Sequence, residues 1–139
     1  MYELCSSLAT LLLLTPGRWW QGVYTARCAQ TCCLHPGSLG HEELDARTFA
    51  LDWEADYVKE DSCGGCPADS DSRAQYTKFG AALNRTGRPV VFALCGLAAQ
   101  YFPEAHSIGN MWRVGTDDGS WNTVLGTCSR LLVGLAKSR

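Results

Sequence analysis

Two aspartates lie where predicted strands end, a place in which carboxylates can do chemistry. Asp61 follows a run of strand formers that begins at Tyr57, and the turn residue Gly64 comes soon after it. Asp117 follows a second candidate strand, 111–114, in the same way. Because the carboxyl ends of parallel strands meet at one mouth in an α/β barrel, both carboxyl groups would face one pocket.

A pair of carboxyl groups about 5–5.5 Å apart suits retaining glycoside hydrolysis. The ionised carboxylate attacks the sugar, and the protonated partner gives its proton to the departing oxygen. On the residues alone, the alternative is that Asp61 and Asp117 are ordinary loop aspartates, each starting a solvated turn or capping the next element.

The elements that must position these groups alternate between strands and helices. Strands are predicted at 22–25, at 57–61, within the apolar run 89–95 and at 111–114. A helix that begins near Glu42 should bury four residues with helical spacing, which are Ala46, Phe49, Ala50 and Trp53. A second should bury Tyr76, Phe79, Gly80 and Leu83 and end at Gly87, and the tail 121–135 should be helical. This order predicts βαβ units and a parallel sheet.

Composition narrows the classes of function. The chain has 139 residues, the length of one ordinary domain, and a net charge of -2 with a pI near 5.9, so it lacks the basic field that nucleic-acid binding needs. Eight cysteines favour an oxidising compartment. The apolar stretch from Leu8 to Leu14 resembles the core of a signal peptide, but Glu3 precedes it without any basic residue, and it is too short to span a bilayer.

A series of motifs lies between Gly22 and Trp121, at 22–24, 31–32, 35–40, 42–50, 56–63, 83–89, 94–95 and 109–113. In their order and nearly in their spacing, these segments resemble the α-galactosidases (melibiases) and their α-N-acetylgalactosaminidase relatives. Residues 1–21 match nothing in the family, and 22–139 would be an incomplete catalytic barrel. The resemblance implies an α/β fold, a partial (β/α)8 TIM barrel with about strands three to six and their helices.

The resemblance also implies roles for individual residues. The aspartate of the family's Lys-x-Asp-x-Cys segment is the nucleophile, which corresponds to Asp61, and the aspartate four positions after the Trp-Arg pair is the acid/base, which corresponds to Asp117. Lys59 and Arg113 would bind sugar hydroxyls or orient the carboxylates, and Tyr24 would line the pocket. The alternative is a solvated surface charge for Lys59 and Arg113, and ordinary strand packing for Tyr24.

Further expectations concern cysteines, location and substrate. The resemblance implies a structural disulfide between Cys32 and Cys63, an α-galactoside substrate, no metal or cofactor, and a secreted or lysosomal/vacuolar protein. Asn84 begins the sequon Asn-Arg-Thr and would carry a glycan if the chain enters the secretory pathway. Exposed sheet edges of an incomplete barrel would favour self-association.

The sequence departs from the family's pattern in several places. Ala26 stands where an aspartate is usual and Cys28 where a glycine is usual, while the residues after Cys95 are Gly-Leu rather than Glu-Trp, which leaves open the choice between galactose and N-acetylgalactosamine. One residue is missing between Asp117 and Trp121, so Asp118 is a second candidate acid.

Two rival functions stay open. One is a thiol or zinc site built from Cys63-Gly64-Gly65-Cys66 with Cys32-Cys33, although adjacent cysteines are unusual zinc ligands. The other is a non-catalytic remnant that binds sugar or a partner. This alternative is kept because the family's earlier strands, whose residues bind the sugar, have no counterpart before Gly22.

Overall fold

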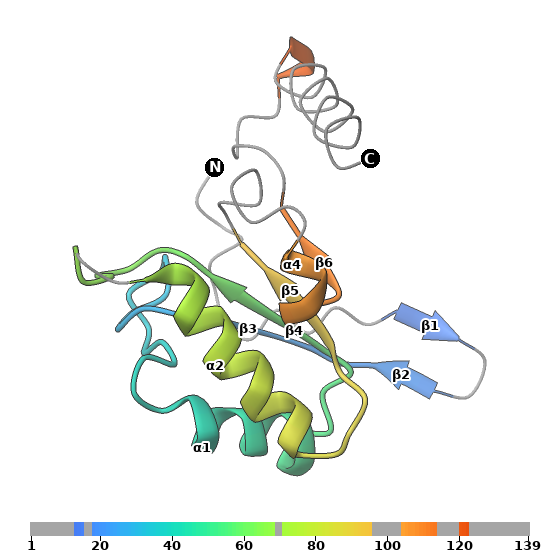
Figure 1. Cartoon of the computed structure of the whole chain (residues 1–139). Coiled ribbons are helices and arrows are strands. Elements are labelled where there is room, and N and C mark those ends of the chain that lie inside the picture. The colour runs from blue at the N-terminus through green and yellow to red at the C-terminus, as the bar shows by residue number, and fades with distance from the viewer. Residues whose placement is uncertain (1–12, 16–17, 69–70, 96–103, 114–119, 123–139) are drawn as a thin grey trace.

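The chain folds around a four-stranded parallel sheet, seen in a computed structural model that describes residues 13–15, 18–68, 71–95, 104–113 and 120–122 (Figure 1). Its strands follow the order of the sequence: β3 Gly22–Ala26, β4 Tyr57–Asp61, β5 Val91–Leu94 and β6 Met111–Trp112. All pairs are parallel. The predicted α/β architecture with a parallel sheet is therefore confirmed.

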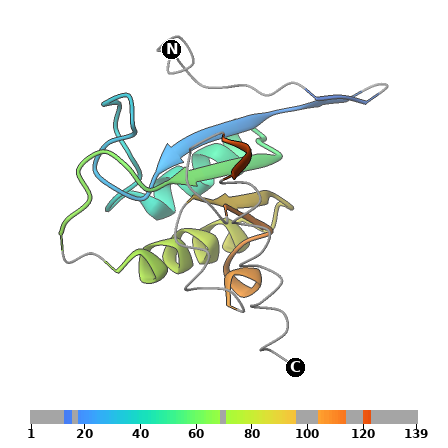
Figure 2. The same ribbon diagram turned by 90° about the horizontal axis from the view of Figure 1, so that it is seen from above.

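Helices cover one face of this sheet (Figures 1 and 2). They are α1 Glu42–Arg47, its π-helical continuation η1 Thr48–Asp52, α2 Ser72–Arg85 and the short α4 Ala105–Ile108. Asp71 caps α2, since its carboxylate accepts hydrogen bonds from the backbone N–H of Arg73 at 2.9 Å and of Ala74 at 3.2 Å. Among the described residues, no helix is long and apolar enough to cross a membrane.

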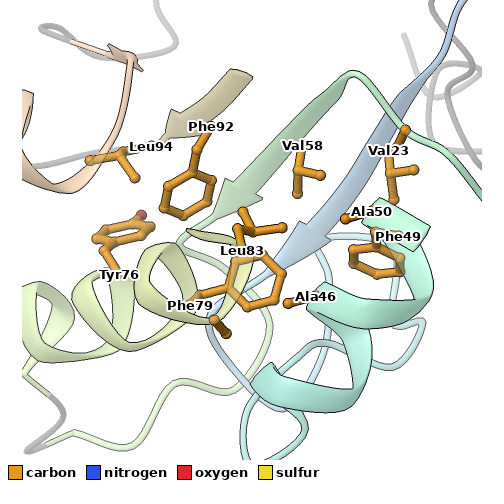
Figure 3. Close-up of a cluster of buried hydrophobic side chains, with 12 residues drawn as sticks. Val23, Ala46, Phe49, Ala50, Val58, Tyr76, Phe79, Leu83, Phe92 and Leu94 are labelled. Carbon is orange, nitrogen blue, oxygen red and sulfur yellow. The ribbon is translucent and has the colours of Figure 1, made fainter. Parts of the chain in front are cut away.

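The core lies between the sheet and the helices (Figure 3). Strand residues in register share a face, so Val23, Val58 and Phe92 all point toward the helices. They meet Phe49 from η1 and Phe79 from α2, whose rings are 6.4 Å apart between centroids. The remaining members of the cluster are Ala46, Ala50, Ala55, Tyr76, Ala82, Leu83 and Leu94.

The prediction that Trp53 is buried beside Ala46, Phe49 and Ala50 is wrong, because the tryptophan is 40% exposed. The π-helical turn explains the difference: its hydrogen bond from Trp53 N to Thr48 O spans five residues, so the last turn is wider than an α-helical one and the phase of the apolar stripe shifts. Trp53 instead leans on Phe49 with ring centroids 5.2 Å apart.

A two-stranded antiparallel hairpin precedes the sheet and was not predicted from the sequence. It consists of β1 Leu13–Thr15 and β2 Arg18–Trp20 and projects from the body (Figure 2). The signal-like stretch before Leu13, the candidate acids Asp117 and Asp118 and the predicted helix at 121–135 fall wholly or mostly outside the described residues.

Candidate active site

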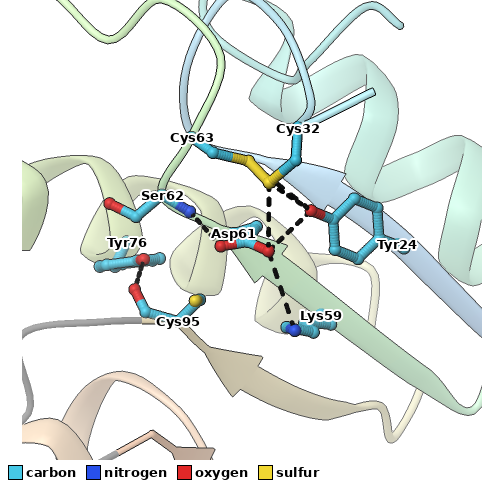
Figure 4. A network of polar contacts seen from close by, with 8 residues as sticks. All are labelled: Tyr24, Cys32, Lys59, Asp61, Ser62, Cys63, Tyr76 and Cys95. Atoms are coloured by element: carbon cyan, nitrogen blue, oxygen red, sulfur yellow. Dashed lines mark hydrogen bonds and ion pairs between the residues drawn. A yellow bond between two sulfur atoms is a disulfide. The ribbon is translucent and has the colours of Figure 1, made fainter. Parts of the chain in front are cut away.

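Asp61 is the last residue of β4, and the pleat of the strand directs its side chain to the face of the sheet opposite the helices. Its register partner on β3 is Ala26, and Tyr24 and Lys59 are another register pair with side chains on the same face. Three residues predicted for the site are therefore brought together by strand pairing alone: Tyr24, Lys59 and Asp61 (Figure 4).

The carboxylate of Asp61 is held by direct contacts on both oxygens. The Tyr24 hydroxyl donates a hydrogen bond to Oδ2 at 2.6 Å, and the backbone N–H of Ser62 donates to Oδ1 at 2.7 Å. Lys59 Nζ lies 3.8 Å from Oδ2 and 5.5 Å from the centroid of the Tyr24 ring. Donors and a cation that converge on one carboxylate fix both its direction and its charge.

The electrostatic result is an Asp61 that stays ionised. Burial alone would raise its pKa, but hydrogen bonds from the Cys95 thiol, Tyr24 and the Ser62 N–H, together with the charge of Lys59, lower the pKa below its ordinary value. The same contacts act in reverse on the donors: burial and the bond to Asp61 raise the pKa of Tyr24, and they raise that of Cys95 to about 11. A carboxylate of low pKa suits a nucleophile.

Two disulfides bracket this carboxylate. Cys32, in the loop after β3, is joined to Cys63, in the loop after β4, with their Cα atoms 5.2 Å apart. Cys28 is joined to Cys66 with a Cα separation of 4.5 Å. The loops also touch at Gly64, which has a φ of 75° and whose position leaves no room for a Cβ, because it would lie 2.0 Å from the carbonyl oxygen of Gln30.

The disulfides bear on the thiol or zinc alternative. The sulfur atoms of Cys32 and Cys63 and a carboxylate oxygen of Asp61 lie within 4.8 Å of one another, a spacing that could hold a metal ion. In the structure, however, the two sulfurs are bonded to each other, and Cys63 and Cys66 have different partners. The Cys63-Gly-Gly-Cys66 motif is therefore not an internal redox pair here.

Of the other predicted residues, Arg113 lies near the Cys95 thiol and Asn84 does not lie at the site. Arg113 directly follows β6, where its backbone N–H donates to the Leu94 carbonyl at 3.1 Å, and its charge is close enough to lower the pKa of the Cys95 thiol. Asn84 is exposed near the end of α2, and this helix covers the face of the sheet opposite the one to which Asp61 points. Asp117 is outside the described residues, so its distance from Asp61 is not given by the structure.

Sequence reasoning gave no role at the site to Cys95 and Ser62. Cys95 is a free, buried thiol that follows β5 directly, as Ser62 follows β4. The signal for both was their place at the carboxyl ends of neighbouring parallel strands, the same signal that singled out Asp61.

Comparison with known proteins gives a consistent result. A sequence model of the family described as alpha galactosidase A matches residues 16–129. The alpha-galactosidase mel1 of Schizosaccharomyces pombe is 40% identical over 102 residues, which cover 69% of this chain and 23% of that protein. The alpha-galactosidase of Cyamopsis tetragonoloba is 43% identical over 107 residues, 74% of this chain and 25% of that protein.

A solved structure agrees with the sequence relatives. The alpha-galactosidase from Saccharomyces cerevisiae with raffinose superposes with a TM-score of 0.64 at 36% identity, and the match covers 69% of this chain and 22% of that one. The parallel sheet with its helices is thus an α/β part of an alpha-galactosidase TIM barrel, and the chain spans about a quarter of the length of the relatives it matches. With a family match over most of its length, the chain belongs to the alpha galactosidase A family.

Proposed function

We propose that the chain carries the nucleophile, and with Asp117 the acid/base, of a retaining glycoside hydrolase that removes terminal α-linked galactose from oligosaccharides or glycoconjugates. The observation that carries this proposal is the environment of Asp61, an ionised carboxylate at the end of a barrel strand, held on one oxygen by Tyr24 and on the other by the Ser62 N–H. The side chain of Asp61 is 14% exposed, so most of it is buried and part of it remains accessible from solvent.

The proposed reaction has two steps. Asp61 forms an ester with the anomeric carbon while the bond to the leaving oxygen breaks, and Asp117 gives that oxygen its proton. Water then attacks the same carbon, Asp117 takes a proton from the water, and Asp61 is released as a carboxylate. Two displacements at one carbon retain its configuration. Lys59 and Arg113 are proposed to bind sugar hydroxyls or to orient the carboxylates, and Tyr24 to line the pocket as well as to hold Asp61.

A second candidate function is a non-catalytic module that binds sugar or a partner. The observation that favours it is coverage, because the chain matches only about a quarter of its relatives' length. The environment of Asp61 favours the hydrolase instead. Its hydrogen bonds lower the pKa of its carboxylate, and shifted pKa values cluster at catalytic sites.

The location of the protein is part of the proposal. Two disulfides between loops fit a secreted or lysosomal/vacuolar protein, because such bonds persist in oxidising compartments.

Asn84 is exposed and would be accessible to glycosylation in such a compartment. A loss of mass on glycosidase treatment of secreted product is the expected result, and an unchanged mass would contradict the glycan.

The decisive experiment for function places the chain's residues 22–121 into the alpha-galactosidase of Cyamopsis tetragonoloba in place of the matching segment, to give a grafted enzyme with a complete barrel. We expect it to hydrolyse an aryl α-galactoside with retention, and not the β-galactoside. Asp61→Asn should abolish turnover, whereas Asp117→Asn should spare substrates whose leaving group needs no proton. A folded graft with no activity would contradict the proposal and favour the non-catalytic module.

A further inference from the structure

Arg27 is a buried arginine with 8% exposure that directly follows β3 and is joined to the backbone of the Asp61 turn. Its backbone N–H donates to the carbonyl oxygen of Asp61 at 2.9 Å, which continues the pairing of the two strands by one residue. The residue therefore lies beside the candidate nucleophile without touching its carboxylate.

The guanidinium of Arg27 is fixed from three directions. Nε donates to the Ser62 hydroxyl at 2.7 Å, and Nη1 donates to the side-chain oxygen of Gln75 on α2. The group also lies over the ring of Tyr76, 5.9 Å from its centroid. The planar guanidinium can make these bonds at once because its donors are arranged as a rigid fork, an arrangement that a lysine ammonium lacks.

Ser62 links this guanidinium to the site. Its hydroxyl is held by Arg27, and its backbone N–H donates to Oδ1 of Asp61 at 2.7 Å. A change that frees the Ser62 side chain loosens the turn that aims this N–H. The side chain of Arg27 can therefore act on the carboxylate of Asp61 through one intervening residue.

The side chain of Glu60 also faces this region, and its pKa responds to the charge of Arg27. Glu60 is fully buried on the helix side of β4, and neither carboxyl oxygen has a hydrogen-bond partner among the described residues. Burial, with the charge of Glu42 from α1, raises the pKa of Glu60 well above its ordinary value, while the charge of Arg27 acts in the opposite direction. A raised pKa favours the protonated carboxyl, which attracts a guanidinium less than a carboxylate does.

We propose that Arg27 is a positioning residue for Asp61, which acts through Ser62 to hold the carboxylate in the direction and hydrogen-bonding state that nucleophilic attack requires. The catalytic role of Arg27 rests on the function proposed above. Its effect on the hydrogen bonding of Asp61 is independent of that function.

The test follows the titration of the Asp61 side-chain carboxyl by carbon-13 NMR in the full 139-residue chain, with the signal assigned through Asp61→Asn. In Arg27→Gln we expect this carboxyl to titrate at higher pH than in the unsubstituted chain, because the Ser62 N–H bond to the ionised form is weakened. Arg27→Lys keeps the charge but not the fork, so it should restore little of the shift. Arg73→Gln is the matched control, since Arg73 pairs with Glu104 at the surface, at 2.8 Å.

Ser62→Ala removes the acceptor for Arg27 and leaves the backbone N–H in place. It should shift the Asp61 titration in the same direction, and the double variant should add little to either single change. This variant also decides the question if Arg27→Gln does not fold. Titration at an unchanged pH in folded Arg27→Gln, or in Ser62→Ala where the former is unfolded, would overturn the proposal.

The grafted enzyme separates the two claims. There, Arg27→Gln should lower kcat by about tenfold and leave KM nearly unchanged, because misdirection of the nucleophile affects the chemical step. If the graft is inactive but the titration shift is present in the 139-residue chain, the positioning role stands and the proposed hydrolase function fails. An active graft whose Asp61 titration and kcat do not respond to Arg27→Gln would overturn the positioning role alone.

Discussion

Glu60 and Asp61 are adjacent carboxyl groups that β4 directs to opposite faces of the sheet, and their environments drive their pKa values apart. Asp61 meets donors and a cation, which lower its pKa, whereas Glu60 is fully buried on the helix side, which raises its pKa. A one-residue step along a strand is enough for this contrast because successive side chains alternate between faces.

The first prediction concerns Tyr24, whose hydroxyl donates to Asp61 at 2.6 Å. In the grafted enzyme, Tyr24→Phe removes a hydrogen bond to the ionised carboxylate, so the pKa of Asp61 rises. Since attack requires the ionised form, the acid limb of kcat/KM should move to higher pH. We also expect kcat/KM to fall by about 10- to 100-fold, because a charged hydrogen bond contributes about 1.5–3 kcal/mol. The pH profile of kcat/KM measures both effects. An unchanged acid limb would show that the hydroxyl does not tune Asp61.

A second prediction concerns Glu60. Its pKa is raised in the folded chain, so above the ordinary glutamate pKa the unfolded chain has lost a proton that the folded chain retains, and stability falls as pH rises. The groups that face it are Glu42, Arg27 and Tyr76. Glu60→Gln cannot ionise, so it lacks this loss of stability. As the pH rises from 4 to 8, the free energy of unfolding of Glu60→Gln should increase relative to that of the unsubstituted chain by at least about 1 kcal/mol, because one pKa unit corresponds to about 1.4 kcal/mol.

Denaturant unfolding at several pH values measures this difference. Glu104→Gln, at a half-exposed surface site, is the control that should follow the unsubstituted chain. Parallel pH curves for Glu60→Gln and the unsubstituted chain would mean that Glu60 is ionised in the folded state.

At the scale of elements, the sequence predicted β3, β4, β5, β6, α1 and α2. Among these, β4, α1 and α2 bury residues at strand or helix spacing and β5 is a continuous buried run. The π-helical turn could not be foreseen, since it departs from the 3.6-residue period on which the prediction for Trp53 depended. The four-residue α4 is too short to show a period. The hairpin β1–β2 was missed although the turn dipeptide Pro16-Gly17 stands between its strands, because each strand has only three residues.

The residues of the site also fall into a group that was predicted from the sequence and a group that was not. Strand ends located Asp61, and the family resemblance supplied Tyr24 and Lys59, all of which lie together. Arg27 and Ser62 each follow a strand directly, but the hydrogen bond that joins them spans 35 positions and is not visible in any local pattern.

A third prediction concerns the two loops that frame Asp61. Peptide mapping of non-reduced protein should recover Cys32 joined to Cys63 and Cys28 joined to Cys66, as in the structure. Each crosslink would constrain the unfolded chain by about 3–4 kcal/mol in the entropic account, so Cys32→Ser should lower stability by that order. Recovery of Cys63 joined to Cys66 would contradict the pairing.

At the scale of the whole molecule, the chain holds about a quarter of its relatives' length, and among the described residues β3 and β6 each pair with a neighbour strand on one side only. Unpaired edges favour association, because barrel closure normally removes them. We therefore expect the purified 139-residue chain to self-associate and to show little or no turnover of an aryl α-galactoside. Light scattering and a turnover assay check this, and a stable monomer with ordinary turnover would contradict it.

The central claim is that Asp61 forms the covalent bond to the sugar, and mass spectrometry of a trapped intermediate tests it most directly. The grafted enzyme would be treated with a fluorinated α-galactosyl donor whose glycosyl-enzyme breaks down slowly, then digested and mapped. We predict one adduct per molecule, on Asp61 within the peptide that contains Lys59, and no adduct in Asp61→Asn. An adduct on another residue, or an active enzyme that accumulates no adduct and inverts its product, would contradict the assignment.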